Sequence, residues 1–264
     1  MGLPLENIMI SIIIPTTIGG IGYIAALMPQ LSQEKDCEII VIDNSSKDGT
    51  CNYLSQYDCK IVVNKIGRNF SQSNNQGAKI AQGDYLLFLN NDTTVTSGFS
   101  QKMLNVFSID PKIGAVGCLI YTSDYPKRVQ HAGIQFTENY LPYELGLEIP
   151  SISKGITNND DLTMSVREVP SVTACCAMIK RSVFEQVNGF DEGYFTGWED
   201  TDLMLRIREA GYKIWYTGLT HIFHKRFGSK NAGRMKFEEQ NRARYDQTWV
   251  HTGRARNVLG DFRQ

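Results

Sequence analysis

The sequence predicts an α/β fold in which a mostly parallel central sheet is flanked by helices. In the first half of the chain, short apolar runs alternate with segments of helical length. These runs are continuously apolar, which is typical of parallel strands buried on both faces. The chain has 264 residues, of which 42% are hydrophobic and 21% charged. Such a length and composition suit a globular domain with a full core.

The first half contains four expected strands, at residues 10–15 (ISIIIP), 37–43 (CEIIVID), 60–64 (KIVVN) and 84–90 (DYLLFLN). Helix-length segments separate them, at residues 22–33, 48–56 and 71–82. In parallel sheets, ligands bind at the carboxyl ends of the strands. Polar clusters follow three of these strands, at residues 15–17, 43–46 and 90–92. We therefore expect a ligand site at this edge of the sheet.

The second half is expected to be more mixed. Apolar runs at residues 113–121, 171–179 and 213–218 indicate strands, and residues 199–212 and 234–249 indicate helices. Residues 121–169 are polar and irregular, with an expected mobile loop at 153–161. Nothing marks a linker. We expect one domain over residues 1–230 and a C-terminal helical appendage over 231–264.

Charge and cysteine usage exclude several classes of protein. Lys and Arg total 27 and Asp and Glu total 28, so the net charge of −1 argues against a nucleic-acid partner. The six cysteines form no CxxC pair, which favours reduced thiols over a zinc site. No signal peptide is recognised, and no run approaches the roughly 18 apolar residues of a membrane span. We expect a cytoplasmic protein, and contact with the inner face of a membrane stays compatible with the sequence.

The cluster Asn90-Asn91-Asp92 ends a buried strand with one formal charge. Mg²⁺ and Mn²⁺ prefer oxygen ligands and often share them with substrate phosphates. A metal site and a simple β-turn are equally good interpretations of this cluster alone. Asp43 also follows a strand directly, where it can accept hydrogen bonds from a nucleobase or ribose. The alternative for Asp43 is a turn or helix cap, because the residues after it are turn formers.

Three carboxylates, Glu199, Asp200 and Asp202, stand at an expected helix start. Acidic residues there can simply stabilise the first helical turn, and Asp202 can pair with Arg206 four residues on. However, Phe195 and Trp198 supply an apolar wall, and a carboxylate between such a wall and a cleft suits a general base.

The segment THIFHKRFGSK places His224 beside Lys225 and Arg226. His224 can complete a metal site or contact phosphate, and the two cations can neutralise a leaving group. A single histidine is more often structural. The arginines of the C-terminal helix form a solvated face or, as the weaker alternative, contact an anionic acceptor or lipid head group.

Four segments, in order, resemble the family 2 glycosyltransferases, most closely their rhamnosyltransferase-like bacterial members. They are SIIIPT (11–16), EIIVIDNSSKDGT (38–50), NFSQSNNQGAKIAQGDYLLFLNNDT (69–93) and VTACCAMIKRSVFEQVNGFDEGYFTGWEDTDLMLRIREAGYKIWY (172–216). The resemblance covers roughly residues 9–229. It implies the GT-A fold of nucleotide-diphospho-sugar transferases, a Rossmann-like sheet with a donor half at about 1–110 and an acceptor half at about 111–230.

The resemblance also implies a reaction, in which a sugar is transferred with inversion from a UDP- or dTDP-sugar donor. The acceptor would be a hydroxyl of a glycan or lipid-linked sugar, in cell-envelope polysaccharide synthesis. By matching positions, Asp200 is the general base, with Glu199 beside it. The expected nucleotide contacts are Pro15, Thr16, Thr17, Asp43, Arg68, Asn75 and Asn91. The expected ligands of a divalent metal, Mn²⁺ or Mg²⁺, are Asp92, Asn90 and His224. The expected acceptor-side residues are Trp198, Asp202 and His131.

Three positions depart from the family pattern. Asn90 replaces the first Asp of the DxD motif, so metal binding is expected to be weaker. Asn69 replaces a Gly and is expected to adopt a left-handed conformation. Ala174 replaces a Gly near the acceptor strand and is expected to narrow the site.

Two other functions stay open at this point. A non-catalytic sugar-nucleotide-binding or scaffold domain is favoured only by Asn90. A sugar nucleotidyltransferase would normally have a basic, Gly-rich loop after the first strand, and PTTIGGIGYI lacks a Lys or Arg.

Overall fold

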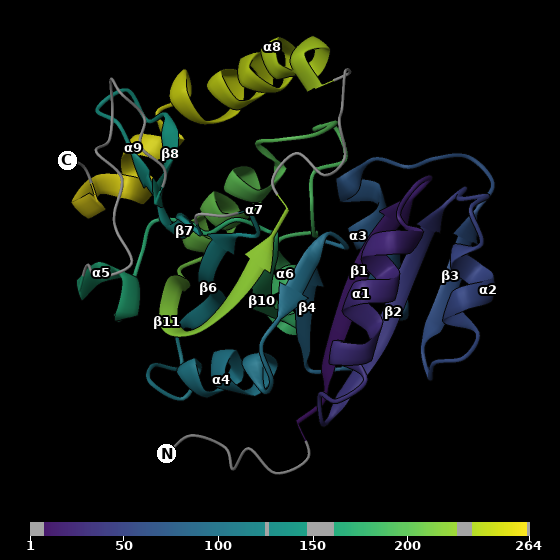
Figure 1. Ribbon diagram of the computed structural model, residues 1–264. Coiled ribbons are helices and arrows are strands. Elements are labelled where there is room, and N and C mark those ends of the chain that lie inside the picture. Colours follow the sequence, from purple (N-terminus) through teal and green to yellow (C-terminus); the bar gives the residue numbers. More distant parts are fainter. Residues whose placement is uncertain (1–7, 125–126, 147–160, 226–233, 263–264) are drawn as a thin grey trace.

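One mixed sheet forms the centre of the computed structural model, which describes residues 8–124, 127–146, 161–225 and 234–262 (Figure 1). The strand order along the sheet is β3-β2-β1-β4-β10-β6-β11-β5; β7 pairs with β6 and β8, and β9 pairs with β11. The strands are β1 (Ile10–Thr17), β2 (Cys37–Asn44), β3 (Lys60–Asn64), β4 (Tyr85–Leu89), β5 (Thr93–Val95), β6 (Ile113–Thr122), β7 (Val129–Phe136), β8 (Pro142–Gly146), β9 (Val166–Glu168), β10 (Cys176–Lys180) and β11 (Lys213–His224).

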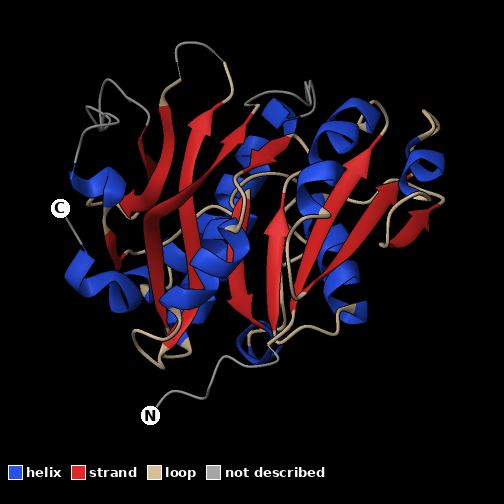
Figure 2. Cartoon of the chain, turned by 60° about the horizontal axis from the view of Figure 1, so that its bottom comes forward, coloured by secondary structure: helices blue, strands red, loops and turns tan. Residues whose placement is uncertain are grey.

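Helices lie on both sides of this sheet (Figure 2). They are α1 (Ile21–Leu31), α2 (Thr50–Leu54), α3 (Phe70–Ile80), α4 (Phe99–Val106), α5 (Asp161–Met164), α6 (Arg181–Gln186), α7 (Glu199–Glu209), α8 (Arg234–Tyr245) and α9 (Arg254–Leu259). A π-helical turn (Asp246–Val250) joins α8 to α9, and a 3₁₀ turn (Gly260–Phe262) follows α9.

Alternation along the strands divides the core between the two faces of the sheet. In β1, Ile12 and Ile14 belong to a cluster with residues of α1 and α4, whereas Ile13 belongs to a cluster with residues of α6 and α7. All three isoleucines are fully buried. A strand covered on both faces needs apolar residues at every position, which explains the continuous apolar runs in the sequence.

The expected parallel arrangement holds for β3, β2, β1 and β4 and for the pair β6 and β11. Strand β10 runs antiparallel to β4 on one side and to β6 on the other. The sheet is therefore mixed. The carboxyl ends of β1, β2 and β4 lie at one edge, next to the amino end of β10.

Several elements of the second half differ from the sequence prediction. The strand expected at 171–179 begins only at Cys176. Residues 121–169, expected to be irregular, contain β7, β8 and β9. The strand expected at 213–218 continues to His224, because a bulge lets residues 218–220 loop out between two paired stretches. Most of the loop expected at 153–161 lies outside the described residues.

The C-terminal helices pack onto the rest of the chain through a third apolar cluster. Tyr245, Trp249 and Leu259 are buried there against Leu205 of α7 and Phe136 of β7. Burying such large side chains stabilises a fold by about 1.5–3 kcal/mol each. In Figure 1, α8 (yellow) lies above the sheet, on the side towards which β1 and β4 point. It therefore approaches the same edge as the polar clusters.

Candidate active site

The end of β1 is joined to the end of β4 by a side-chain hydrogen bond. Asn91 Nδ2 donates to Thr16 Oγ1 at 2.9 Å, and Thr16 is nearly fully buried. Thr16 lies opposite Asp43 in the register of β1 and β2. Gly20 approaches this pair so closely that a Cβ would collide with Thr16 Oγ1. Thr17, the last residue of β1, is exposed and Pro15 is half-buried at this edge.

Asp43 is fully buried, and hydrogen bonds from its own loop satisfy its carboxylate. It accepts from Ser46 N at 3.0 Å, Ser46 Oγ at 2.8 Å and Cys51 Sγ at 2.9 Å. Burial, together with the hydrogen bond to Asp43, raises the pKa of the Cys51 thiol to about 11. Asp43 thus orders the turn after β2, which is the turn alternative of the sequence analysis, whereas the N-cap of α2 is Gly49.

Beyond β3, a pocket of about 390 Å³ opens beside Arg68. Its lining residues are Asn64, Lys65, Ile66, Gly67, Arg68 and Gln72. Arg68 Nε donates to Asn64 Oδ1 at 3.2 Å, and Asn64 Nδ2 donates to Asn44 Oδ1 at 3.0 Å. The pocket therefore presents a preorganised set of amide and guanidinium groups at the edge where Asp43 lies.

Asp92 and His224 meet at the other end of this edge. Asp92 Oδ1 lies 3.1 Å from His224 Nε2, and their side chains are 8% and 13% exposed. The antiparallel pairing of β5 with β11 aligns His224 with Thr93, the residue after Asp92. On the opposite side of the ring, His224 Nδ1 lies 2.9 Å from the amide of Gln130. Gln130 is a buried residue of β7 for which the sequence holds no signal.

The Asp92–His224 pair suits a Mn²⁺ or Mg²⁺ ion that is shared with a diphosphate. Both side chains offer donor atoms that such a metal accepts, and Asn90, the third expected ligand, carries a neutral amide oxygen two positions before Asp92 in the sequence. In the described part of the chain, no group of three or more His, Cys, Asp or Glu residues could hold a metal. The protein would thus supply few ligands, and the phosphate oxygens and water would complete the coordination.

Two successive residues connect the expected base to the expected metal motif. Ala174 N donates to Asp200 Oδ2 at 3.3 Å, and Cys175 O accepts from Asn90 N at 3.0 Å. Burial raises the pKa of the Cys175 thiol well above 9.0, and the negative charges of Asp92 and Asp200 contribute to the same increase. The segment before β10, which the sequence assigned to the strand itself, thus contacts Asp200 and Asn90 through main-chain atoms of two adjacent residues. Thr201 N donates to the second oxygen of Asp200 at 2.8 Å.

The helix that carries Asp200, α7, begins in an unusual conformation. Gly197 and Trp198 both have positive φ angles, of 84° and 75°. Trp198 is half-buried, and its ring lies 4.9 Å from that of Tyr245. Glu199, which follows, is 8% exposed, whereas Asp200 is half-buried. Asp200 is therefore the more accessible member of the carboxylate pair.

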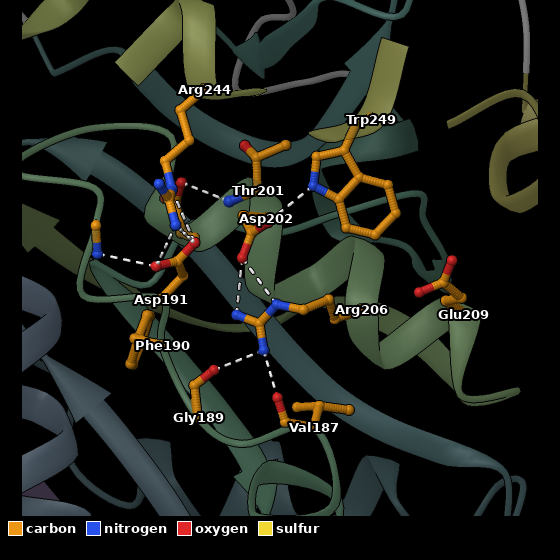
Figure 3. Close-up of polar contacts among 12 residues, drawn as sticks. Val187, Gly189, Phe190, Asp191, Thr201, Asp202, Arg206, Glu209, Arg244 and Trp249 are labelled. Carbon is orange, nitrogen blue, oxygen red and sulfur yellow. Dashed lines mark hydrogen bonds and ion pairs between the residues drawn. The ribbon is translucent and has the colours of Figure 1, made fainter. Parts of the chain in front are cut away.

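Asp202 is held inside the protein and is not presented to an acceptor (Figure 3). Its side chain is 2% exposed and forms an ion pair with Arg206 at 2.8 Å. Its other oxygen accepts from Trp249 Nε1 at 2.8 Å. A buried carboxylate is stable only when its charge is paired and its oxygens accept hydrogen bonds. Arg206 and Trp249 meet this need inside the protein, so the Asp202 carboxylate does not face a cleft. This geometry corrects the acceptor-side role expected for Asp202.

His131 is also fully buried and does not face an open acceptor site. Burial, and secondarily the charge of Arg167, lower the pKa of His131 to about 3. Its Nδ1 lies 3.9 Å from Glu144 Oε2, beyond hydrogen-bond distance. His131 is thus a neutral core residue, and Glu144 on β8 is a carboxylate that the sequence did not single out.

Asn75 of α3 and Asn69, the N-cap of that helix, hold the loop that precedes Asp200. Asn75 donates to Phe190 O at 2.9 Å and accepts from Phe190 N at 2.9 Å, so its amide is engaged away from the expected nucleotide contact. Asn69 caps α3 with an extended φ of −72° and donates to Tyr194 O at 3.2 Å. The left-handed conformation expected for Asn69 is therefore wrong, because the capping role requires extended backbone.

Three arginines of the C-terminal helices, Arg242, Arg244 and Arg254, are paired within the protein. Arg244 pairs with Asp191 at 2.7 Å (Figure 3), Arg242 with Asp246 at 2.7 Å, and Arg254 with Glu209 at 2.5 Å. These pairs favour the structural interpretation of this basic segment over an anionic partner.

Two family models match the sequence over the regions that build this site. The family described as "Glycosyl transferase family 2" matches residues 11–187. The family described as "N-terminal domain of galactosyltransferase" matches residues 161–226, which include Asp200, the loop before it and His224.

Among curated proteins, the chain is similar to O-antigen biosynthesis protein RfbC of Myxococcus xanthus, with 31% identity over 198 residues. The match covers 74% of this chain and 15% of RfbC, so the chain spans only a small part of that relative. It is also 27% identical over 219 residues to N-acetylglucosaminyl-diphospho-decaprenol L-rhamnosyltransferase of Mycobacterium tuberculosis, covering 76% of this chain and 70% of that enzyme.

Solved structures show the same fold at low identity. The chain resembles GalNAc-T7 with UDP, GalNAc and Mn²⁺, with a TM-score of 0.67 and 18% identity over 84% of this chain and 44% of that one. It also resembles the mannosyltransferase PcManGT from Pyrobaculum calidifontis in complex with GDP-Man and Mn²⁺, with a TM-score of 0.63 and 15% identity over 92% and 65% of the two chains. The expected GT-A fold is thereby confirmed.

Proposed function

This chain belongs to glycosyl transferase family 2, and we propose that it transfers a sugar from a nucleotide-diphosphate donor to a hydroxyl of a glycan or lipid-linked acceptor. The donor is a UDP- or dTDP-sugar, and the product belongs to cell-envelope polysaccharide synthesis. One observation carries the proposal: Ala174 and Cys175 join Asp200 to Asn90. Through this connection the Asp200 carboxylate and residues 90–92 lie at one edge of the sheet, which supports their proposed roles as base and diphosphate-binding motif.

The proposed reaction is a direct displacement with inversion. Asp200 takes the proton of the acceptor hydroxyl, whose oxygen attacks the anomeric carbon as the bond to the diphosphate breaks. Asp92, His224 and Asn90 would hold a divalent cation, which supplies electrostatic stabilisation to the departing diphosphate. Thr16, Asn91 and the pocket beside Arg68 would bind the nucleoside. Both solved neighbours described above carry Mn²⁺ with a nucleotide.

In the described part of the chain, no helix has the length and apolar character needed to cross a bilayer. We propose that the protein works on the cytoplasmic side and reaches lipid-linked acceptors through peripheral contact with the membrane. Sedimentation with acceptor-containing vesicles checks this proposal.

The test of the donor site is a thermal-shift panel with UDP, dTDP and GDP, each with and without Mn²⁺. A ligand at 100 times its Kd stabilises the native state by about 2.7 kcal/mol. We expect one nucleotide to stabilise the protein, and to do so only with Mn²⁺. Asp92→Ala should lose that stabilisation, whereas Glu239→Ala, an exposed carboxylate of α8, should keep it.

A nucleotide that binds without any donor turnover would favour the non-catalytic binding domain, for which Asn90 is the supporting feature. No shift with any nucleotide would contradict the donor site itself.

A further inference from the structure

The backbone just before Asp200 adopts a conformation that the sequence alone does not favour. Trp198 has a φ of 75°, and Gly197 before it has a φ of 84°. A bulky residue in the left-handed region costs of order 1–3 kcal/mol and persists only where its surroundings determine it. Something outside this loop therefore holds it in place.

Helix α8 supplies that constraint through one buried amide. Asn241 is 2% exposed, and its side chain forms hydrogen bonds with the main chain of this loop. Its Oδ1 accepts from Phe195 N at 3.2 Å. Its Nδ2 donates to Thr196 O at 2.8 Å and to Gly197 O at 3.1 Å. Three consecutive loop residues are thus bound by a side chain more than forty positions away.

Neighbouring residues on the same face of α8 hold the loop side chains. Glu238 Oε1 accepts from Trp198 Nε1 at 3.0 Å. The ring of Phe237 stacks on Phe195 at 3.8 Å, and that of Tyr245 lies 4.9 Å from Trp198. Positions 237, 241 and 245 are four residues apart and share one helix face. This face of α8 therefore packs against the side chains of the loop as well as binding its main chain.

We propose that Asn241 is a positioning residue that fixes residues 195–198 and, through them, the orientation of Asp200. The inference rests on the proposed function, because it takes Asp200 as the base. Neither family match reaches α8, since the matches cover residues 11–187 and 161–226. Helix α8, which lies outside both matched regions, would thus complete a site whose other residues lie inside them.

An amide is required at this position because the loop presents one donor and two acceptors. In Asn241→Asp, the bond from Phe195 N can persist, but a carboxylate oxygen then faces the carbonyls of Thr196 and Gly197. In Asn241→Ala, all three main-chain groups lose their partner. An unsatisfied buried polar group costs about 1–3 kcal/mol, which is enough to release the loop from its left-handed conformation.

The experiment compares Asn241→Asp and Asn241→Ala with Gln240→Glu and Gln240→Ala. Gln240 is the adjacent, exposed residue of α8, so its variants repeat the charge and the truncation without touching the loop. The first measurement is hydrogen–deuterium exchange of the peptide spanning 190–199, which needs no substrate. The second is donor hydrolysis with the UDP- or dTDP-sugar selected by the thermal-shift panel, in which water takes the place of the acceptor.

We expect amide exchange at 190–199 to become at least about tenfold faster in both Asn241 variants, which corresponds to a local loss of 1.4 kcal/mol. Exchange in β1 and α1 should stay unchanged. The kcat should fall about 100-fold, the loss typical of a misplaced catalytic group, while the donor KM stays within about twofold. The Gln240 variants should match the wild type in every measurement.

Unchanged exchange and unchanged kcat in both Asn241 variants would overturn the inference. So would a parallel loss of nucleotide binding and of protection in β1, because Asn241 would then support the whole fold. If the wild type itself shows no donor turnover, the proposed function fails, and the exchange measurement still decides whether Asn241 holds the loop.

Discussion

The proposed donor edge, at the ends of β1 and β4, and the loop before Asp200, residues 189–198, are built in different ways. At the donor edge, Thr16 and Asn91 sit at the ends of parallel strands, and the backbone of those strands places them. The loop has no strand of its own and is held by amide side chains, with Asn69 and Asn75 on one side and Asn241 on the other. Strand ends can be recognised from local sequence, whereas an amide contact over a hundred positions cannot.

The sharpest test of this contrast is Asp200→Asn, which should separate the two regions. We expect kcat to fall by about 100- to 10,000-fold, because the amide cannot accept the acceptor proton. Nucleotide binding at the donor edge should persist, as measured by thermal shift with Mn²⁺. Glu239→Gln serves as the control. If Asp200→Asn loses binding and turnover together, Asp200 is structural and the two regions are not separable.

The next largest effect, on stability, is expected at Asp202, whose partners Arg206 and Trp249 hold the first turn of α7 after the loop. Asp202→Ala should lower the free energy of unfolding by about 3–5 kcal/mol, because it leaves Arg206 without its buried counterion. It also removes the acceptor for Trp249 Nε1. Urea denaturation followed by tryptophan fluorescence measures the change. A loss below about 1 kcal/mol would mean that Asp202 is solvated, as an acceptor-side residue would be.

A smaller effect should appear in the pH dependence of stability. His131 has a pKa of about 3 in the folded protein and 6.5 as its ordinary value. Below pH 6.5, His131 is protonated in the unfolded chain but stays neutral in the native state. Its contribution therefore lowers the free energy of unfolding as the pH falls towards 3. Between pH 7 and pH 5 this loss amounts to about 2 kcal/mol.

In the His131→Leu variant, the free energy of unfolding should fall by about 2 kcal/mol less between pH 7 and pH 5 than in the wild type, whatever the stability of the variant at pH 7. Urea denaturation of both proteins at pH 7 and pH 5 gives the two differences. Arg167 and Glu144 face His131 and are kept in both proteins, so equal pH dependence in the two would contradict a buried neutral His131.

The smallest effect is expected at the exposed pair of Arg254 and Glu209. Their side chains are 36% and 41% exposed, so Arg254→Ala should change the unfolding free energy by less than about 1 kcal/mol. Activity should stay unchanged. A larger loss would extend the network that supports the loop as far as α9.

The donor half was predictable because its signals are local. The bounds predicted for β3 match the structure, and those for β2 differ by one residue. The second half was less predictable. β7 and β8 carry polar residues, and the buried Gln130 of β7 depends on His224 of β11 for its hydrogen bond. The interpretation of Asp202 failed for the same reason, since Trp249 lies 47 positions away.

For the candidate site, the sequence could predict several candidate residues but not the contacts that position them. The sequence indicated Asp92, His224 and Asp200, but not Gln130 behind His224 or Asn241 behind the loop. Neither position belongs to a motif, and an amide in a helix or strand has no distinctive pattern. Only the three-dimensional contacts distinguish them from solvated side chains.

The adjacency of Ala174 and Cys175 has a consequence for how such a protein can vary. Both contacts use main-chain atoms, Ala174 N towards Asp200 and Cys175 O towards Asn90. Engineered variants should therefore tolerate a change of residue type at 174 or 175, to side chains of similar size, better than an insertion or deletion between them. A change of length would move Asp200 and Asn90 relative to each other, whereas a change of side chain would not.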